Sequence, residues 1–329
     1  MIARCAIPLA ILVVAVSTVL PVISAAAQTY PSRPITIIAP YAVGGTTDLI
    51  GRIMAERMRA ALGQPVIVEN VTGANGTIGV GRVARAPGDG YTLDVGQLAT
   101  HVTNGALYRL PYDLVTDFEP VALVGSIPTL IAAKKAMPAS DLTGFIAWLK
   151  SNPNKASQGV AGVGSTSHIL GVSFQKATGT HFQFVPYRGT APAVLDLVAG
   201  NVDIVMSDPI SALPQVQAGT IKVYALTTSH RQSIMPDIPT VDEAGLPGFH
   251  MSNWYALFAP KRTPKTIIEK LNAVVVDALA DPTVRARFAD QGVETFPREQ
   301  QTPEALRALQ KADIDKWWPI IEAAGIKAQ

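Results

Sequence analysis

Cysteine is nearly absent from this sequence: the 329 residues contain one, Cys5. It lies within residues 1–27, where a positively charged start is followed by an apolar stretch from Ala6 to Ile23 and by three alanines. This pattern predicts a secretory signal peptide that is cleaved before Gln28. The mature protein then has no cysteine, which excludes disulfide bonds and thiol chemistry even in an oxidising compartment. Its stability must come from a hydrophobic core.

An excess of charge of either sign is also missing. The sequence has 27 lysines and arginines against 25 aspartates and glutamates, a formal net charge of +2. A nucleic-acid-binding protein usually shows a basic excess, so we expect no nucleic-acid partner. Beyond the signal peptide, the longest apolar run, Val121 to Ala133, is interrupted by small and polar residues and is too short to cross a membrane. We expect a soluble, exported protein.

Motifs for catalysis and for cofactors are missing too. The five histidines show no pair at metal-ligand spacing. Ser165 and His168 are three residues apart, which places them on one helical turn rather than in a triad, and Gly-x-Ser-x-Gly is absent. Gly79 to Ala84 fits Gly-x-Gly-x-x-Ala, but it lies inside a predicted helix rather than directly after a strand. We expect no metal, no cofactor and no enzyme activity.

Strand-like and helical patterns alternate from the predicted mature N-terminus onward. Short runs rich in Ile, Val and Leu predict strands, and apolar residues spaced three and four apart predict helices between them. A β-α-β-α-β order indicates a parallel sheet covered by helices. The predicted strands are 35–39, 66–69 and 91–95, and the predicted helices are 49–62 and 76–85.

The pattern starts again after the apolar run at 121–133, which predicts a second lobe. The C-terminal third, from residue 264 to residue 324, is mostly helical, and its helices most simply return to cover the first lobe. The second lobe is predicted to contain helices at 142–149, 166–177 and 192–200, and strands at 158–161, 182–185, 202–206 and 221–226.

Two glycines stand between the first predicted strand and the first predicted helix, in APYAVGGTTDLIGR, residues 39–52. At Gly44 and Gly45 the backbone can approach a bound group closely, and the N–H groups of the first helical turn point at it. A carboxylate suits such a turn; phosphate is disfavoured because no Gly-Lys-Ser/Thr follows the glycines. Asp48 could instead simply cap the helix. Both interpretations of this turn stay open.

A similar turn occurs in the second predicted lobe, in GVAGVGSTSHILG, residues 159–171. Two such turns in two lobes would hold a small anion from both sides. His168 would face either the cleft or solvent. Asp208 follows a strand end, and could face the cleft or cap the next helix. Neutral donors would come from the hydroxyls of Thr46, Thr47, Ser165, Thr166 and Ser167.

Five separated segments, in order, carry a recognisable pattern. They are YPSRPITIIAPYAVGGTTDLIGR, LGQPVIVENVTGANGTIGVGRVARAPGDGYTL, LPYDLVTDFEPVALVG, VPYRGTAPAVLDLVAGNVDIVMSD and IPTVDEAGLPGF. With these segments the whole mature chain resembles the Bug-type (tripartite tricarboxylate transporter receptor) periplasmic solute-binding proteins.

The resemblance implies an α/β, two-lobed periplasmic-binding-protein fold of type II, the Venus flytrap. Each lobe is then a mainly parallel sheet flanked by helices, and two crossover strands join the lobes. We expect residues 28–128 and 229–329 in the first lobe, and residues 129–228 in the second.

The resemblance also implies a function and a site. The protein is then a periplasmic, non-enzymatic receptor that binds a small organic carboxylate: a di- or tricarboxylate, an acidic amino acid or an aromatic carboxylate. It delivers this ligand to a membrane permease of one large and one small subunit, and we expect a monomer. A sensor module or, less favoured, a hydrolase on the same scaffold stays open. The ligand-binding residues implied are Tyr41, Gly44, Gly45, Thr46, Thr47, Asp48, Gly162, Gly164, Ser165, Thr166, Ser167 and His168, with Asp208 as a further candidate.

Overall fold

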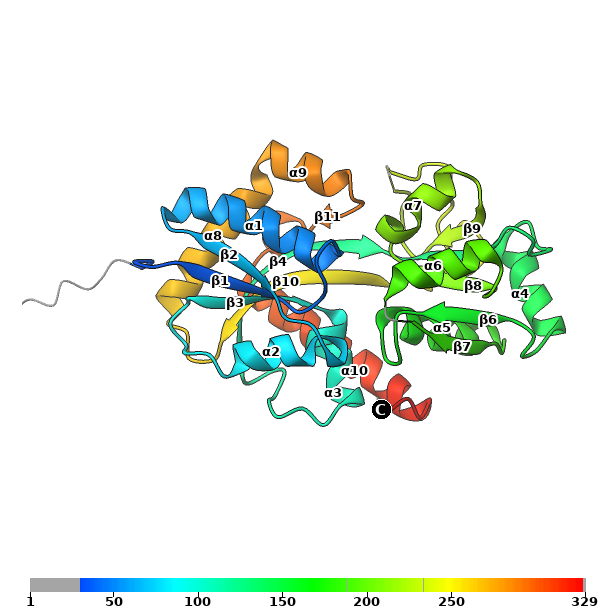
Figure 1. Cartoon of the computed structure of the whole chain (residues 1–329), viewed down its shortest axis with the longest axis horizontal. Helices are drawn as coiled ribbons and strands as arrows, with labels where there is room; N and C mark the ends of the chain where they lie inside the picture. The colour runs from blue at the N-terminus through cyan, green and yellow to red at the C-terminus, as the bar shows by residue number, and fades with distance from the viewer. Residues whose placement is uncertain (1–29, 188, 233, 328–329) are drawn as a thin grey trace, which may run out of the picture.

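Two lobes lie side by side and are joined by extended segments that run between them (Figure 1). The computed structural model describes residues 30–187, 189–232 and 234–327, so the predicted signal peptide lies outside the described residues. Each lobe has a mixed sheet of its own, flanked by helices. None of the described helices is both long enough and apolar enough to span a membrane.

The first lobe contains a six-stranded sheet in the order β11-β4-β10-β3-β1-β2. β1 is parallel to β2 and β3, as the predicted β-α-β-α-β order requires, whereas β10 runs antiparallel to β3 and β4. The strands are β1 (Ile35–Ala39), β2 (Val66–Asn70), β3 (Thr92–Gln97), β4 (Phe118–Pro128), β10 (Ser252–Pro260) and β11 (Glu294–Thr295). The helices are α1 (Thr46–Leu62), α2 (Thr77–Ala84), α3 (Asn104–Leu107), α8 (Lys265–Ala280), α9 (Pro282–Ala289) and α10 (Pro303–Ala323).

The second lobe contains a five-stranded sheet in the order β7-β6-β8-β5-β9. β6 is parallel to β7 and β8, and β5 is antiparallel to β8 and β9. The strands are β5 (Leu130–Lys134), β6 (Ser157–Val160), β7 (Gln183–Pro186), β8 (Ile204–Ser207) and β9 (Ile221–Leu226). The helices are α4 (Leu142–Ser151), α5 (Thr166–Thr178), α6 (Thr190–Ala199) and α7 (Pro209–Gln217).

The C-terminal helices pack on the first sheet, as the sequence predicted. Leu271 and Val275 of α8 are fully buried in one core with Ile50 and Met54 of α1. On the other side of the sheet, Trp317 of α10 is buried in a second core. The last third of the chain therefore closes the lobe that the first third began.

The apolar run at 121–133 is not one strand. It is divided at Thr129 between β4 of the first sheet and β5 of the second, so this run is the first crossing between the lobes. Its largely apolar character reflects burial in two different sheets rather than a long single strand.

The chain returns to the first lobe through residues 227–251. Much of this segment is bonded to the second sheet: the Leu226 N–H donates to the Pro239 carbonyl at 2.9 Å, and the Val241 N–H donates to the Leu226 carbonyl at 2.8 Å. These contacts favour a second-lobe boundary near residue 251 rather than near residue 228. The lobe boundaries stay a prediction.

The two crossings meet at a pair of buried threonines, Thr129 and Thr227. The Thr227 N–H donates to the Thr129 carbonyl at 2.8 Å, and the Thr129 N–H donates to the Thr227 hydroxyl oxygen at 3.2 Å. The Thr227 hydroxyl lies within hydrogen-bonding distance of the carbonyls of Thr129 and Met251. One buried hydroxyl thus joins three segments of backbone at the hinge.

Replacement of this hydroxyl by a methyl group, Thr227→Val, should lower the free energy of unfolding by about 2 kcal/mol, because buried backbone groups lose their partner. Urea unfolding would measure the change. Thr228→Val is the matched control: its hydroxyl donates to the His230 carbonyl on the surface, and its loss should change stability little. Equal effects of the two substitutions would show that the hydrogen bonds of Thr227 at the hinge contribute no more to the free energy of unfolding than a surface hydrogen bond does.

Candidate functional site

The first predicted loop, residues 40–45, carries the chain from β1 into α1. Gly44 has a φ of +86°, which residues with a side chain rarely adopt, and a Cβ there would meet nothing within 4 Å. Gly45 is the N-cap of α1, and no side chain caps the helix. The N–H groups of Thr46 and Thr47, in the first turn, have no acceptor within the helix. The two glycines therefore leave open space at an uncapped helix N-terminus.

Asp48, predicted either to bind the ligand or to cap the helix, is buried in the first turn and holds the loop. Its Oδ2 accepts bonds from the Gly44 N–H and Arg52 Nε, both at 3.0 Å, and its Oδ1 accepts from Asn70 Nδ2 at 3.0 Å. Burial alone would raise the pKa of this carboxyl, but the bonds from Arg52, Gly44 and Asn70 outweigh burial and lower it. Both carboxylate oxygens thus have partners within the protein.

The second predicted loop carries the chain from β6 into α5. Gly162 has a φ of +113° and Gly164 one of +78°, so both positions favour glycine. Ser165 is the N-cap of α5, and its Oγ accepts from the His168 N–H at 3.3 Å. The first-turn amides of Thr166 and Ser167 remain without an acceptor inside the helix.

His168 and Ser167 fix this second loop. The Gly164 N–H donates to His168 Nδ1 at 3.0 Å, and the Ala161 N–H donates to Ser167 Oγ at 3.0 Å. The imidazole packs edge-on against Phe184, and burial lowers its pKa, so the ring is neutral at pH 7. His168 therefore supports the loop from inside the lobe rather than facing solvent.

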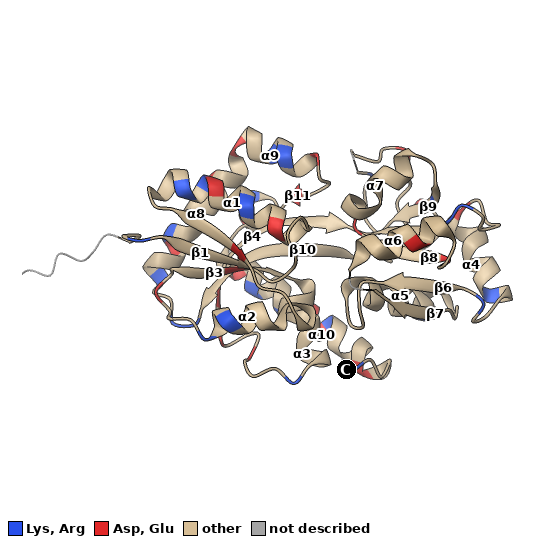
Figure 2. Cartoon of the chain, viewed as in Figure 1, with Lys and Arg blue, Asp and Glu red and all other residues tan. Residues whose placement is uncertain are grey.

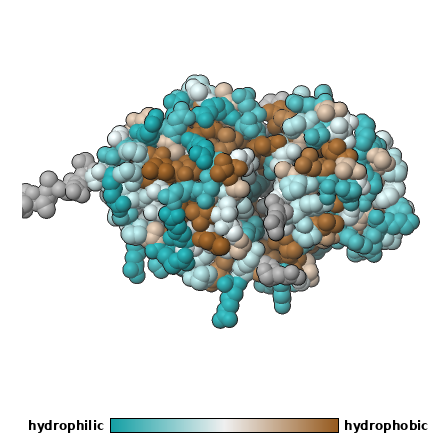
Figure 3. Space-filling view, viewed as in Figure 1, coloured by the Kyte–Doolittle hydropathy of each residue, from teal (hydrophilic) through white to brown (hydrophobic). Residues whose placement is uncertain are grey.

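The two lobes touch beside the second loop. A Cβ at Gly164 would overlap the side chain of Leu107, which belongs to α3 of the first lobe. The surface is indented between the lobes in the space-filling view (Figure 3). Figure 1 places the start of α1 and the loop before α5 at the facing ends of the two lobes.

Asp208, the remaining sequence candidate, is the N-cap of α7: its Oδ1 accepts from the Ser211 N–H at 3.1 Å. Burial raises its pKa. Burial raises the pKa of the Tyr255 phenol in β10. The negative charge of the Asp208 carboxyl adds to this increase, and a hydrogen bond with the Thr46 hydroxyl opposes it. Asp208 of the second lobe thus lies near Tyr255 of the first.

Sequence reasoning missed a set of polar side chains behind the first loop. Asn253 Nδ2 donates to Gln97 Oε1 at 2.5 Å and to the Tyr255 hydroxyl at 2.8 Å. Asn253 Oδ1 is buried and has no partner among the described residues. Gln97 is the last residue of β3 and Asn253 the second residue of β10, and an amide side chain at a strand end is the signal that could have identified them.

Tyr41 extends this polar set. Its hydroxyl donates to the Asn75 carbonyl at 3.2 Å, and Asn75 Nδ2 donates to Asn104 Oδ1 at 2.9 Å. Asn75 lies just before α2, and Asn104 follows a π-helix over Ala99–Thr103 that the sequence did not predict. Four segments of the first lobe therefore meet behind the glycine loop.

The site is suited to holding an anion through neutral donors. Neither loop contains a lysine or arginine within residues 40–48 or 161–168. Opposite charges are interspersed over the outer surface rather than gathered on one face (Figure 2). Among the described residues, no group of three or more His, Cys, Asp and Glu side chains is placed to hold a metal ion. Backbone N–H groups at two helix starts are the available donors.

A family model described as "Tripartite tricarboxylate transporter family receptor" matches residues 50–326. BugT of Bordetella pertussis is 34% identical over 303 residues, which cover 92% of this chain and 92% of that protein. The chain belongs to the tripartite tricarboxylate transporter receptor family, whose members are periplasmic solute receptors. The resemblance inferred from the five sequence segments is confirmed.

Solved structures agree with this assignment. The periplasmic binding protein BugD is 38% identical with a TM-score of 0.80, covering 91% of this chain and 100% of that one. MatC of Rhodopseudomonas palustris, with bound malate, is 39% identical with a TM-score of 0.80, covering 89% and 100%. Rpa4515 of R. palustris, with adipate, is 32% identical with a TM-score of 0.82, covering 91% and 100%. The predicted two-lobed periplasmic-binding-protein fold is confirmed.

The substitution Asp48→Asn should lower the free energy of unfolding at pH 7 by about 2 kcal/mol, because a buried charged acceptor is lost. The lowered pKa means that the folded protein binds this proton less readily than the unfolded chain. The stabilisation is therefore present above the ordinary Asp pKa of about 3.9 and is lost as the pH falls below it.

Urea unfolding of both proteins at pH 7 and at lower pH would measure this difference. Glu56→Gln is the control on the same helix, since Glu56 pairs with Arg287 on the surface and such pairs contribute little. A gap between wild type and Asp48→Asn that stays constant down to pH 2.5, roughly one unit below that ordinary pKa, would contradict the assignment.

Proposed function

We propose that this member of the tripartite tricarboxylate transporter receptor family binds a small organic carboxylate between its lobes and delivers it to a membrane permease. The permease would be of the tripartite tricarboxylate type, with one large and one small subunit. The receptor acts as a monomer in the periplasm after cleavage of residues 1–27, and it does not transform its ligand.

One observation carries the proposal: two glycine loops, one in each lobe, end in helix N-termini whose first-turn amides are not capped by the helix itself. The partial positive charge at a helix start favours an anion. A carboxylate with two oxygens can accept from amides of both α1 and α5 when the lobes close. Because the donors are neutral, lobe opening can release the ligand without breaking a buried ion pair.

The ligand-contacting residues follow from the same geometry. Gly44, Gly45, Thr46 and Thr47 would present the amides and hydroxyls of the first lobe, and Tyr41 would border them. Asp48 contributes by positioning this loop, because its oxygens already have partners. In the second lobe, the contacts would come from Gly162, Gly164, Ser165, Thr166 and Ser167, with His168 as support and Asp208 at the facing wall.

Relatives narrow the ligand to carboxylates of a few carbons. Bound malate and adipate in two structures at 39% and 32% identity support a dicarboxylate for this chain. An acidic amino acid or an aromatic carboxylate shares the carboxylate that the two loops require. Asn253 and Gln97 lie where the remainder of such a ligand would extend, since they stand behind the first loop.

Native mass spectrometry of the freshly purified protein would weigh any ligand that it retains. A thermal-shift panel of succinate, malate, adipate, glutamate and nicotinate should then raise the melting temperature for at least one acid, since a ligand at 100 times its Kd adds about 2.7 kcal/mol of stability. No shift with any carboxylate would refute the proposed ligand class. Turnover of a bound acid would refute the non-enzymatic role.

Gly45→Val should weaken binding of the acid identified in this panel at least about tenfold while leaving the fold intact. A Cβ at Gly45 would lie 3.6 Å from the Ala42 carbonyl, which is an ordinary contact, and its φ of −82° suits any residue. Valine would nevertheless cover the first-turn amides of α1. Calorimetry would give the affinity, with Ala61→Val, on the exposed far end of α1, as the matched control. Unchanged affinity in Gly45→Val would remove the first loop from the site.

A further inference from the structure

A second cavity lies at the hinge, with a volume of about 280 Å³. We call it the hinge cavity, and its walls come from the first lobe and from the segment that returns to it. The first lobe contributes the end of β4, the start of β10, the β11 region and α10, and the returning segment contributes Thr227 to His230 and His250. The residues that matter for its chemistry are Trp254, Asp313, Trp317, Phe296, His230 and His250.

The hinge cavity is on the opposite face of β10 from the carboxylate site. Successive side chains of a strand point to opposite faces of its sheet. Asn253 contacts Gln97, and Tyr255 contacts Asn253 and Thr46 at the start of α1, whereas Ser252 and Trp254 line the hinge cavity. The two sites are therefore separate and share one strand as a wall.

The hinge cavity contains a carboxylate that lacks a cationic partner. Trp254 Nε1 donates to Asp313 Oδ2 at 2.7 Å, and no Lys, Arg or His of the described residues lies within ion-pair distance of Asp313. Burial raises the pKa of Asp313, while the Trp254 bond and the charge of Lys316 act against that increase. An added cation at this carboxylate would offset the cost of its burial.

Aromatic rings line the same cavity. Trp254 and Trp317 present indole rings, which attract cations more strongly than other aromatic side chains do. The Lys316 ammonium lies 4.5 Å from the centroid of the Trp317 ring, so this ring already contacts one positive charge. Phe296 adds an apolar surface. The lining thus combines one free carboxylate with aromatic faces.

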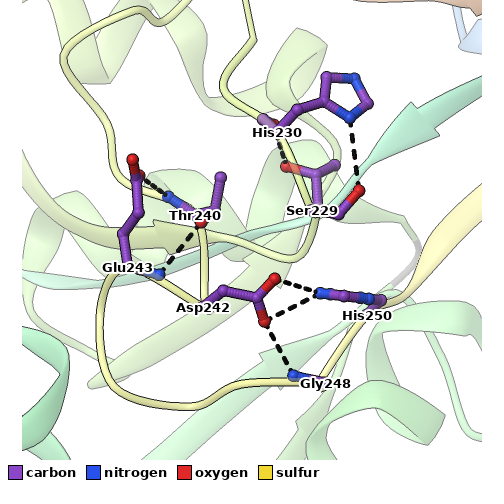
Figure 4. A network of polar contacts seen from close by, with 8 residues as sticks. Ser229, His230, Thr240, Asp242, Glu243, Gly248 and His250 are labelled. Atoms are coloured by element: carbon purple, nitrogen blue, oxygen red, sulfur yellow. Dashed lines mark hydrogen bonds and ion pairs between the residues drawn. The ribbon is translucent and has the colours of Figure 1, made fainter.

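The histidines at the rim do not compete for Asp313. His250 is bonded to Asp242, at 2.9 and 3.0 Å from its two oxygens, and Asp242 also accepts from the Gly248 N–H (Figure 4). His230 lies 3.1 Å from both oxygens of Glu294, a residue of β11. Each rim histidine therefore has a carboxylate of its own, and Asp313 remains for a ligand.

We propose that the hinge cavity binds a small organic cation, a protonated amine on an aromatic or apolar body. The ammonium group would donate to Asp313, and the body would pack against Trp254, Trp317 and Phe296. The volume is at the lower end of the range for small-molecule pockets, which favours a single-ring monoamine.

Benzylamine, which is protonated at pH 7, is a suitable probe, and benzyl alcohol is its neutral counterpart. Calorimetry with the mature protein should show saturable benzylamine binding that is at least about tenfold tighter than that of benzyl alcohol, because a charge-assisted bond is lost in the alcohol. Absence of saturable benzylamine binding, or equal affinity for the two compounds, would overturn the proposal.

Two substitutions on α10 locate the site. Asp313→Asn keeps an oxygen for Trp254 Nε1 but removes the charge, and it should weaken benzylamine binding at least about tenfold. Asp315→Asn is the matched control, because Asp315 is exposed and pairs with Lys311; its affinity should equal that of wild type. Equal affinities for Asp313→Asn and Asp315→Asn would refute the assignment.

Lys316→Gln tests the proposal without touching a buried group. It removes an ammonium that lies over the Trp317 ring and close to the Asp313 carboxylate. Benzylamine then has no competing ammonium at these groups, so its binding should become tighter. Weaker binding in this variant would count against a cation site. A crystal soaked with benzylamine should show the amine beside Asp313, and its appearance only in the cleft between the loops would also refute the proposal.

Discussion

A helix N-terminus that binds an anion must leave the N–H groups of its first turn without acceptors in the protein. The loop before the helix must also be rigid enough to orient these N–H groups toward the anion. Both glycine loops meet this constraint in the same way. The N–H of Gly44 is taken by the side chain four residues later, Asp48, and the N–H of Gly164 is taken by His168, also four residues later. Each loop is thereby fixed through one amide, while the amides of Thr46 and Thr47 and of Thr166 and Ser167 have no acceptor within their helices. Arg52 balances the Asp48 charge, and His168 is neutral, so neither loop places an unbalanced negative charge beside its helix start.

The rest of the fold positions the N-termini of α1 and α5 relative to each other. The lobes are joined at the paired threonines of the hinge, and they also touch at Gly164 and Leu107 near the site. On another side, a Cβ at Gly292 of the first lobe would be only 2.5 Å from the side chain of Ile234, which belongs to the returning segment. The described arrangement is therefore one with the lobes in contact, in which small changes at the hinge alter the spacing of the two loops.

Sequence predicted the elements well because apolar periodicity and glycine positions are local signals. The first strand was predicted with its observed bounds, and Gly63, Gly179 and Gly200 end helices where the sequence placed the stops. The run at 121–133 was predicted to precede the second lobe, and the lobe boundary expected after residue 128 lies next to Thr129, where the chain passes from the first sheet to the second. The two loops were found from glycine and hydroxyl patterns, but the role of Asp48 depends on Asn70 of β2, which only the fold brings to it, as well as on Arg52 one turn further along the same helix. Gln97 and Asn253 are 156 residues apart, and no sequence spacing connects them.

The alternation of β10 links the two sites that the structure suggests. Tyr255 contacts Thr46 at the start of α1 and Asn253 contacts Gln97, whereas Ser252 and Trp254 line the hinge cavity, and the strand itself carries the chain out of the returning segment. The hinge cavity is lined by the first lobe and by Thr227 to His230 of the returning segment, so its shape depends on how that segment lies against the first lobe. A molecule that fits it better in one arrangement shifts the balance between open and closed forms, and binding at the cleft must in return shift the affinity of the cavity by the same factor. Coupling between the two sites thus needs only the shared strand β10 and the rotation of one lobe relative to the other.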